Sequence, residues 1–314
     1  MRHIRLAICA TLFAILLASA SMAQNGRTFV SGAGDDKSPC SLTSPCRTFG
    51  EAISLTNAGG EVVVLTSAGY GPFTISKAVT VEAAPGVYAG ITVTTGDGID
   101  INAGTMDTVT LRGLTVNNQG GNGSGIVFNT GGTLHIEGCV VNGFSAQGAG
   151  GLAILAPGNI FVKDTIAREN ANGVFVNRIN TGTTSVSMDR VHSDANQVGL
   201  LVVPAVSGAI VNAAILNSSF SGNESHGIQV AAFVFGGVAL LNIEGCLISN
   251  NNVGMDEEVA SGGAGNVSIS NCTITSNSAF GYTISPLAVI YSRGQNTIMG
   301  NGLNSGSLTS LAGQ

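Results

Sequence analysis

Carboxylate, basic and imidazole side chains gather in one stretch of the sequence, and their chemistry is of two kinds. Carboxylates beside Lys and Arg can bind Ca²⁺ and a uronate while a base removes the proton α to the carboxylate. The same residue types also form ion pairs when they stack on neighbouring strands, and we favour that structural interpretation. His192 is the member that ion pairing does not explain. The residues are Lys163, Asp164, Arg168, Asp189, Arg190, His192 and Asp194.

Three adjacent acids, Asp256, Glu257 and Glu258, form a second cluster. Glu257 stands where equivalent segments of the chain carry an apolar residue, and an unpaired carboxylate is costly to bury. We favour a β-bulge that turns Glu257 outward and lets Val259 take the inward position. The alternative is a functional acid, and three acids on a loop would also bind a cation weakly.

The cysteines separate into groups with different expected roles. Cys40 and Cys46 flank a short Pro-containing segment, and we expect them to form a small disulfide loop in an oxidising compartment. Cys246 and Cys272 fall at equivalent positions of neighbouring repeats, so they form a disulfide or, as we favour, stack as small core side chains. Cys139 has no partner. No His accompanies these thiols at ligand spacing, so we expect no metal site and no cofactor, with Ca²⁺ entering only under a lyase function.

The first 23 residues have the pattern of a secretory signal peptide. Two Arg precede an apolar run from Leu6 to Leu17, which is too short to span a membrane stably, and small residues precede the expected cleavage near Ala23. Cleavage leaves 10 Lys and Arg against 18 Asp and Glu, a net charge of −8. That charge opposes binding to nucleic acid or to an anionic membrane. We expect a secreted protein, periplasmic or extracellular, with no membrane span after cleavage.

The composition points to many short strands and turns. Of 314 residues 45 are Gly, only 10% of the residues are charged, and 44% are hydrophobic. Average proteins contain about 7% Gly and about 25% charged residues. These values exclude a coiled coil, a helical bundle and a basic nucleic-acid-binding protein, and they argue against disorder.

A repeat organises most of the chain. An apolar anchor recurs every 25 to 28 residues, and apolar residues two before and five after most anchors give the alternation of a strand with one buried face. A repeat of this length cannot bury that face alone, so its copies must stack as parallel strands about 4.8 Å apart. The anchors are Leu111, Ile136, Val162, Met188, Ile215, Ile243 and Ile269.

Asparagine occupies one position of successive repeats, eight residues after the anchor. Stacked amides at a turn can bond to one another and to the backbone, which predicts an internal Asn ladder. A Gly follows three or four residues later, where it permits positive φ. The ladder residues are Asn170, Asn196, Asn223, Asn251 and Asn277.

Stacking would also place opposite charges one coil apart on the surface, and it would leave an apolar strip on another face. Such strips mark interfaces, and we favour coverage of the strip by residues 285–314 over coverage by another subunit. The charge columns are Arg112–Glu137–Lys163–Asp189, Asp164–Arg190 and Arg168–Asp194. The strip comprises Phe175, Leu201, Val203 and Ala231, with Phe233 or Phe235 if the register holds.

The repeats from Asp107 to Ile284 resemble the right-handed parallel β-helix proteins of the pectate-lyase-like superfamily. The entry segment from Thr28 to Asp36, followed by Pro45-Cys-Arg-Thr-Phe, looks like the start of many secreted bacterial members. The resemblance implies the fold but no activity, because this scaffold hosts lyases, hydrolases, esterases and non-enzymes. The Asn-Thr-Asp run of polygalacturonase-like enzymes and the Trp-x-Asp-His run of pectate lyases have no match in the sequence. We expect His226, which precedes a turn glycine, to have a structural role in that turn.

The expected architecture is therefore an all-β, single-stranded, right-handed parallel β-helix, or solenoid, of about nine to ten coils. Residues 1–23 form the signal peptide, 24–60 the entry segment, 61–303 the β-helix and 304–314 a polar tail. Apolar residues at helical spacing before Gly59-Gly60 predict a short helix over residues 47–57 that caps the N-terminal end of the core.

For function, we expect a secreted, non-catalytic binding or structural module at the cell exterior, with an extracellular polysaccharide or a surface protein as its partner. One alternative is a polysaccharide lyase or glycoside hydrolase that acts on an acidic polysaccharide through the 163–194 face. The other is a subunit of a secreted assembly that oligomerises through the apolar strip. Nucleic acid is not expected as a partner.

Overall fold

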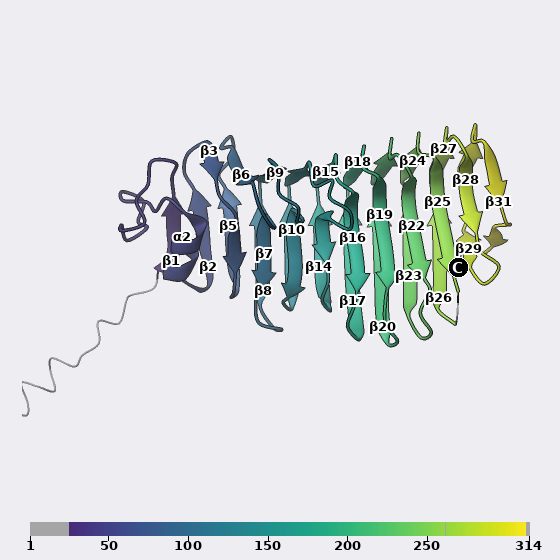
Figure 1. Ribbon diagram of the computed structural model, residues 1–314, viewed down its shortest axis with the longest axis horizontal. Helices are drawn as coiled ribbons and strands as arrows, with labels where there is room; N and C mark the ends of the chain where they lie inside the picture. Colours follow the sequence, from purple (N-terminus) through teal and green to yellow (C-terminus); the bar gives the residue numbers. More distant parts are fainter. Residues whose placement is uncertain (1–24, 261, 312–314) are drawn as a thin grey trace, which may run out of the picture.

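The computed structural model describes residues 25–260 and 262–311, and the expected signal peptide lies outside them. Within these residues the chain forms three parallel sheets of 12, 10 and 10 strands, which wind into a solenoid of about nine turns (Figure 1). This confirms the predicted fold class. Each complete coil adds one strand to sheet A, then one to sheet B, then one to sheet C.

Sheet A begins at the N-terminal end of the stack and contributes the longest strands. Its strands carry the apolar anchors of the repeat on their inward face. In order they are β1 (Asn25–Val30), β2 (Thr56–Val64), β5 (Val79–Ala83), β8 (Thr108–Arg112), β11 (Thr133–Glu137), β14 (Gly158–Lys163), β17 (Gly182–Asp189), β20 (Ala209–Leu216), β23 (Val238–Glu244), β26 (Ala264–Ser270), β29 (Val289–Ser292) and β32 (Thr309–Ser310).

Sheets B and C complete each coil. Sheet B consists of β3 (Ala68–Tyr70), β6 (Ala89–Val93), β9 (Leu114–Asn118), β12 (Val140–Asn142), β15 (Ile166–Arg168), β18 (His192–Asp194), β21 (Ser219–Ser221), β24 (Leu247–Ser249), β27 (Thr273–Thr275) and β30 (Thr297–Met299). Sheet C consists of β4 (Phe73–Ile75), β7 (Ile99–Asn102), β10 (Ile126–Thr130), β13 (Gly150–Ile154), β16 (Asn172–Arg178), β19 (Val198–Pro204), β22 (His226–Ala232), β25 (Val253–Val259), β28 (Phe280–Ile284) and β31 (Leu303–Ser305).

The asparagines stack in file inside the corner between sheets B and C. Asn196 Nδ2 donates to Asn223 Oδ1 at 3.2 Å, and the backbone N–H of Asn196 donates to the same oxygen at 2.9 Å. Asn223 repeats both bonds to Asn251, each at 2.9 Å. Because every amide also donates to a carbonyl of the preceding coil, a buried polar column is satisfied throughout. Asn301 continues the column beyond the predicted members.

The glycines that follow the asparagines serve close packing rather than positive φ. A Cβ built on Gly199 would lie 2.9 Å from Asn223 Nδ2, and one on Gly227 would lie 2.8 Å from Asn251 Nδ2. These glycines are not among the residues with positive φ, so the expected reason for this column was wrong.

Helix α2 (Phe49–Leu55) covers the N-terminal end of the core, within the predicted range. Thr48 caps it by accepting a hydrogen bond from the Glu51 N–H at 3.3 Å. Phe49 is buried, with its ring centroid 4.4 Å from that of Phe73. No helix among the described residues has the length and apolar character needed to cross a bilayer.

The C-terminal segment differs from the expectation. Residues beyond 303 were expected to form a polar tail, but β31 and β32 pair with β28 and β29, so the coiling continues to Ser310. The same pairing means that residues 285–310 extend the stack instead of covering the apolar strip. Of that strip, Phe175, Leu201 and Val203 are half-buried and Ala231 is buried.

Candidate functional site

The charged face predicted between residues 163 and 194 lies on the outer side of sheets A and B. Arg190 bonds to Asp164 at 2.6 Å and to Asp189 at 2.5 Å. The guanidinium of Arg190 holds the pKa of Asp164 below its usual value. Lys163 and Arg168 form no ion pair among the described residues, although Asp189 and Asp194 lie opposite them in register. Only some residues of the predicted charge columns therefore form ion pairs.

Arg112 provides the second junction of the charged surface. It bridges Glu82 at 3.0 Å and Glu137 at 2.8 Å, so it joins three successive coils. Nearly half of its side chain is exposed, and such surface pairs contribute little stability. The sequence pattern had matched Arg112 with Glu137 but not with Glu82.

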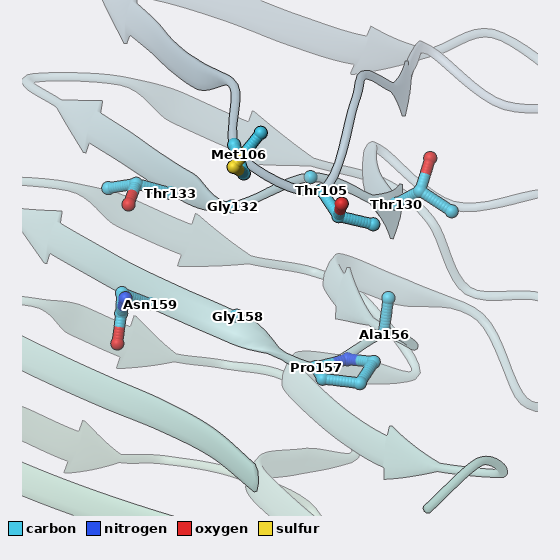
Figure 2. A pocket seen from close by; sticks show the side chains of 10 residues that line it. Thr105, Met106, Thr130, Gly132, Thr133, Ala156, Pro157, Gly158 and Asn159 are labelled. Carbon is cyan, nitrogen blue, oxygen red and sulfur yellow. The ribbon is translucent and has the colours of Figure 1, made fainter. Parts of the chain in front are cut away.

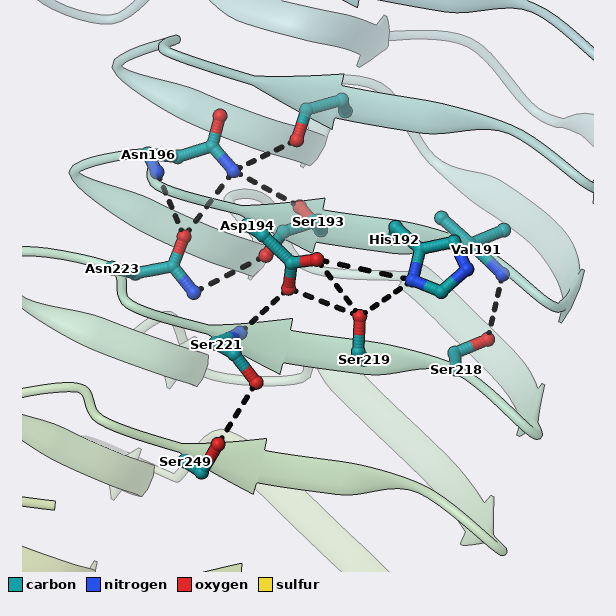
Figure 3. A network of polar contacts seen from close by, with 11 residues as sticks. Val191, His192, Ser193, Asp194, Asn196, Ser218, Ser219, Ser221, Asn223 and Ser249 are labelled. Carbon is teal, nitrogen blue, oxygen red and sulfur yellow. Dashed lines mark hydrogen bonds and ion pairs between the residues drawn. The ribbon is translucent and has the colours of Figure 1, made fainter. Parts of the chain in front are cut away.

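His192 and Asp194 meet around Ser219, which was not among the predicted site residues (Figure 3). Ser219 Oγ lies 2.9 Å from His192 Nδ1 and 2.9 Å from Asp194 Oδ2, and the Ser221 N–H donates to Asp194 Oδ1 at 2.8 Å. The signal for Ser219 was its register position directly opposite His192 on the next coil.

This arrangement lacks the order that nucleophilic catalysis requires. In a catalytic triad the imidazole lies between the hydroxyl and the carboxylate and accepts the hydroxyl proton. Here the Ser219 hydroxyl lies between the other two groups, and its single proton is shared with the Asp194 carboxylate. His192 is also more than half exposed, so water competes for its contacts. The three residues tie two coils together.

The acidic cluster on β25 contradicts the predicted bulge. Glu257 pairs in unbroken register with Val230 and Ile284, its side chain is fully buried, and neither carboxylate oxygen has a hydrogen-bond partner among the described residues. Gly265 makes room for it, because a Cβ there would lie 2.6 Å from Glu257 Oε1. Burial, aided by the Asp256 charge, raises the pKa of Glu257 to about 8. A carboxyl group that stays protonated avoids the cost of burying an unpaired carboxylate, so no bulge is needed to turn Glu257 outward.

Asp256 and Glu258 point to the outer side of sheet C, where they do not converge with Glu257. Asp256 is engaged by Gln229 Nε2 at 3.2 Å, by the Thr283 hydroxyl and by His226 Nε2 at 3.4 Å. Within the described part of the chain, no group of three His, Cys, Asp or Glu side chains is arranged to hold a metal ion. The expected weak cation site therefore has no ligand set among these residues.

His226 takes part in a polar contact beyond the expected turn role. Its Nδ1 lies 2.8 Å from Ser225 Oγ, while Nε2 faces Asp256. Burial lowers the pKa of His226, and the Asp256 carboxylate opposes that shift. A shallow hollow of about 340 Å³ opens beside His226, Asp256 and Glu258.

Two other hollows lie along sheet A. The larger, of about 470 Å³, lies at the start of β11 and β14 and is lined by Thr, Gly, Ala, Pro, Met and Asn residues without a titratable group (Figure 2). The second, of about 380 Å³, crosses the outer face of β14, β17, β20 and β23. Phe161 and Leu240 stand at its sides with Ser185, Asn212 and Asn242.

Arg178, which was not among the predicted site residues, is fully buried at the end of β16. It donates to the carbonyl oxygens of Leu155 and, at 3.0 Å, of Asn180, and burial lowers its pKa. Its contacts with backbone carbonyls hold the turn between sheets C and A. No periodic signal marks it, because the following coils carry Pro204 and Ala232 at this position.

The cysteines divide as their spacing predicted. Cys40 and Cys46 form the expected disulfide in the entry segment. Cys139, Cys246 and Cys272 are free and buried in the core. Burial raises the pKa of the Cys139 thiol to about 11, so it is not reactive at neutral pH.

The arrangement of stacked coils agrees with comparisons to known proteins. The family model described as "Right handed beta helix region" matches residues 97–303, more than half of the chain. The chain belongs to the right-handed β-helix family. No curated protein sequence shows a significant match to it.

Two solved structures are similar to this β-helix protein. The crystal structure of pectate lyase Pel9A covers 88% of this chain and is itself covered over 78% of its length, with a TM-score of 0.50 and 14% identity. The GH136 lacto-N-biosidase from Eubacterium ramulus matches 91% of this chain and 67% of its own, with a TM-score of 0.49 and 8% identity. At such identities the first likeness shows the shared fold alone.

Proposed function

We propose that this β-helix protein acts at the cell exterior as a non-catalytic module that binds an extended polysaccharide on the outer face of sheet A. The observation that carries the proposal is the 380 Å³ hollow that crosses four consecutive coils. It combines two exposed apolar side chains, Phe161 and Leu240, with the amides of Asn212 and Asn242. Apolar surface with a few well-placed polar groups is the usual composition of a ligand site.

The ring of Phe161 is prepared for such a contact. It stacks on His135 with ring centroids 4.9 Å apart and planes 11° apart, so its orientation is fixed while 43% of the residue stays exposed. A fixed aromatic face loses little conformational entropy when a flat ligand binds. The register places Asn159, Ser185 and Asn212 in line along the axis, which suits a polymer rather than a compact ligand.

The charged groups support a non-catalytic role. Asp164 and Asp194 are bonded to Arg and Ser side chains of the next coil, and Asp189 is bonded to the adjacent Arg190 and to the Asn217 amide of the next coil. Asp256 is engaged by three donors. Acid–base catalysis needs a carboxyl or imidazole that faces a bound substrate with its pKa adjusted to the task. These carboxylates instead join coil to coil.

A panel of polysaccharides, incubated with residues 24–314 and read for both binding and cleavage, tests the proposal. We expect at least one polymer to bind and none to be shortened. Phe161→Ala combined with Leu240→Ser should weaken binding at least tenfold, because each removes apolar contact. Leu247→Ser, which removes a similarly exposed side chain on sheet B, should leave binding unchanged. Binding to no polymer, or equal loss in both variants, would contradict the proposal.

A polysaccharide-cleaving enzyme is the second candidate, and one observation favours it. The hollow on sheet C places His226, Asp256 and Glu258 on one surface, and burial together with the Asp256 charge raises the pKa of Glu258. Glycoside hydrolysis requires a pair of carboxyl groups, of which the general acid has a raised pKa. Cleavage in the panel that disappears in both Asp256→Asn and Glu258→Gln, but persists in Phe161→Ala, would establish this function.

A further inference from the structure

Large apolar side chains project from the turns that lead from sheet C into sheet A. Exposure reaches 94% for Met106, 52% for Ile179, 46% for Phe233, 74% for Phe235 and 66% for Leu287. These five residues belong to turns of four different coils, which we call the C–A ridge. The five residues lie in the turns that enter β8, β17, β23 and β29. The turns from sheet C into sheet A line one long edge of the solenoid in Figure 1.

The ridge turns are held by their backbones, so the exposed side chains are not needed to build them. The N–H of Gly182 donates to Gly208 O at 3.0 Å, Gly208 to Gly236 O at 3.0 Å, and Gly236 to Gly262 O at 3.1 Å. Turn therefore stacks on turn as strand stacks on strand. From Ile179 through Phe233 and Phe235 to Leu287 the apolar side chains occur on every second turn of this edge. At about 4.8 Å per coil they span about 19 Å.

The ridge carries almost no charge. In the turns of its five members, Asp107 is the one ionisable residue that the structure describes outside the buried Arg178. The chain without its first 23 residues has a net charge of −8. The described ridge turns therefore lack the exposed basic side chains that an acidic partner would need. The net negative charge of the protein would also repel an anionic surface.

The narrow, convex shape of the ridge favours a lipid bilayer over a second copy of the chain as its apolar partner. A second copy of the chain would bring one narrow ridge against another, and two convex edges in line contact bury much less than the roughly 800 Å² per partner of a standard interface. The headgroup region of a bilayer surrounds each tip and accepts a straight row of tips in one plane. Exposed Phe, Ile and Leu side chains then gain burial without needing a complementary surface.

We propose that the C–A ridge docks the protein peripherally on an uncharged lipid surface, with Ile179, Phe233, Phe235 and Leu287 entering the boundary between headgroups and acyl chains. Binding comes from apolar burial, so it is insensitive to salt. The proposal is independent of the polysaccharide site, because the ridge and the outer face of sheet A share no residue.

Sedimentation of residues 24–314 with phosphatidylcholine vesicles tests the proposal. We expect binding that does not change between about 0.1 M and about 1 M salt, since no ion pair is screened. Adding phosphatidylserine to the vesicles should weaken binding at low salt, because the protein and the vesicles then carry charges of the same sign. Absence of binding to phosphatidylcholine, or binding that requires phosphatidylserine, would overturn the proposal.

Ridge variants locate the contact. Phe233→Ser and Phe235→Ser should each lower vesicle binding about tenfold, as expected for an apolar side chain that no longer leaves water. Leu216→Ser and Leu247→Ser remove side chains of 37% and 41% exposure away from the ridge and should have no effect. Far-ultraviolet circular dichroism checks that each variant is folded. Equal losses in both sets would overturn the proposal, as would a dimer in light scattering that the ridge variants alone disperse.

Discussion

Asn223 and Glu257 are both buried polar side chains, yet their surroundings differ completely. Asn223 bonds to the coil before it and the coil after it, through its side chain and through its backbone. Glu257 lies among Val230, Ile284 and Val259, and neither carboxyl oxygen has a hydrogen-bond partner in the described part of the chain. In a stack of coils a polar residue finds partners when its neighbours along the axis are of the same kind.

This difference indicates which buried polar groups are candidates for a function and which only stabilise the fold. A repeated Asn is satisfied by translation alone, so it reports the fold. A single Glu in an apolar column finds no hydrogen-bond partner among the described residues of the neighbouring coils. It is tolerated in the core because its carboxyl group is neutral below a pKa of about 8. Its protonation state is therefore coupled to stability, whereas the amide ladder does not titrate.

Breaking the ladder in the middle should give the largest effect. Asn223→Ala removes the acceptor of the Asn196 side-chain amide and backbone N–H, and it removes one donor each from Asn251 Oδ1 and the Ser193 carbonyl. We expect a loss of about 4 kcal/mol in the free energy of unfolding, measured by guanidinium chloride denaturation. Asn301→Ala, at the half-buried end of the ladder, serves as the matched variant and should cost about half as much. Equal costs would contradict the view that the ladder is satisfied by translation.

Raising the pH should lower the stability of the protein through Glu257, whereas the Asn ladder should be unaffected. Its pKa is raised from 4.5 to about 8 by folding, so its contribution to stability is complete below pH 4.5 and is lost as the pH rises through 8. Between these limits we expect the free energy of unfolding to fall with rising pH, with a slope that approaches about 1.4 kcal/mol per pH unit through this group. Glu257→Val, which restores an apolar column, should remove that loss in denaturation measured across the pH range.

The control for this effect is a neighbouring acid on the same strand. Glu258→Gln changes a half-buried outward carboxyl and should keep most of the wild-type dependence on pH. A Glu257→Val protein that still lost stability in parallel with the wild type would show that another group titrates.

The surface ion pairs should give the smallest effect. Arg112→Ala removes two contacts that link three coils, and we expect a loss of about 0.5 kcal/mol that shrinks in high salt. Lys163→Ala, which removes a neighbouring cation without an ion pair among the described residues, should be neutral. Denaturation at low and high salt compares the two. A larger loss for Lys163→Ala would show that the charge alternation matters beyond direct contacts.

The sequence predicted the fold well because the stacking of coils turns periodicity directly into position. Asn170 and Asn196 lie 26 residues apart and one coil apart, so their bond was visible as a spacing. Sheet register likewise placed Asp164 beside Arg190. Where one residue type repeats, tertiary structure adds little that the sequence does not contain.

The candidate sites were harder to predict because they depend on residues that break the period. Glu257 was expected to turn outward because its cost was judged for the charged form, whereas burial keeps it protonated. Arg178 was missed because its partners are backbone carbonyls, which a sequence does not display. Lys163 shows the opposite error, since opposite charges in register need not adopt rotamers that meet.

The one-way direction of the Asn ladder has a consequence for how such a chain changes its length. Each side-chain amide donates toward the next coil, from Asn170 onward to Asn301, so every interior member meets the same pair of neighbours. Duplication or excision of one whole coil would rejoin identical donors and acceptors across the junction. The ladder spacings of 24 to 28 residues show that the turns absorb insertions of a few residues, so larger indels in such a gene are expected in multiples of a single coil.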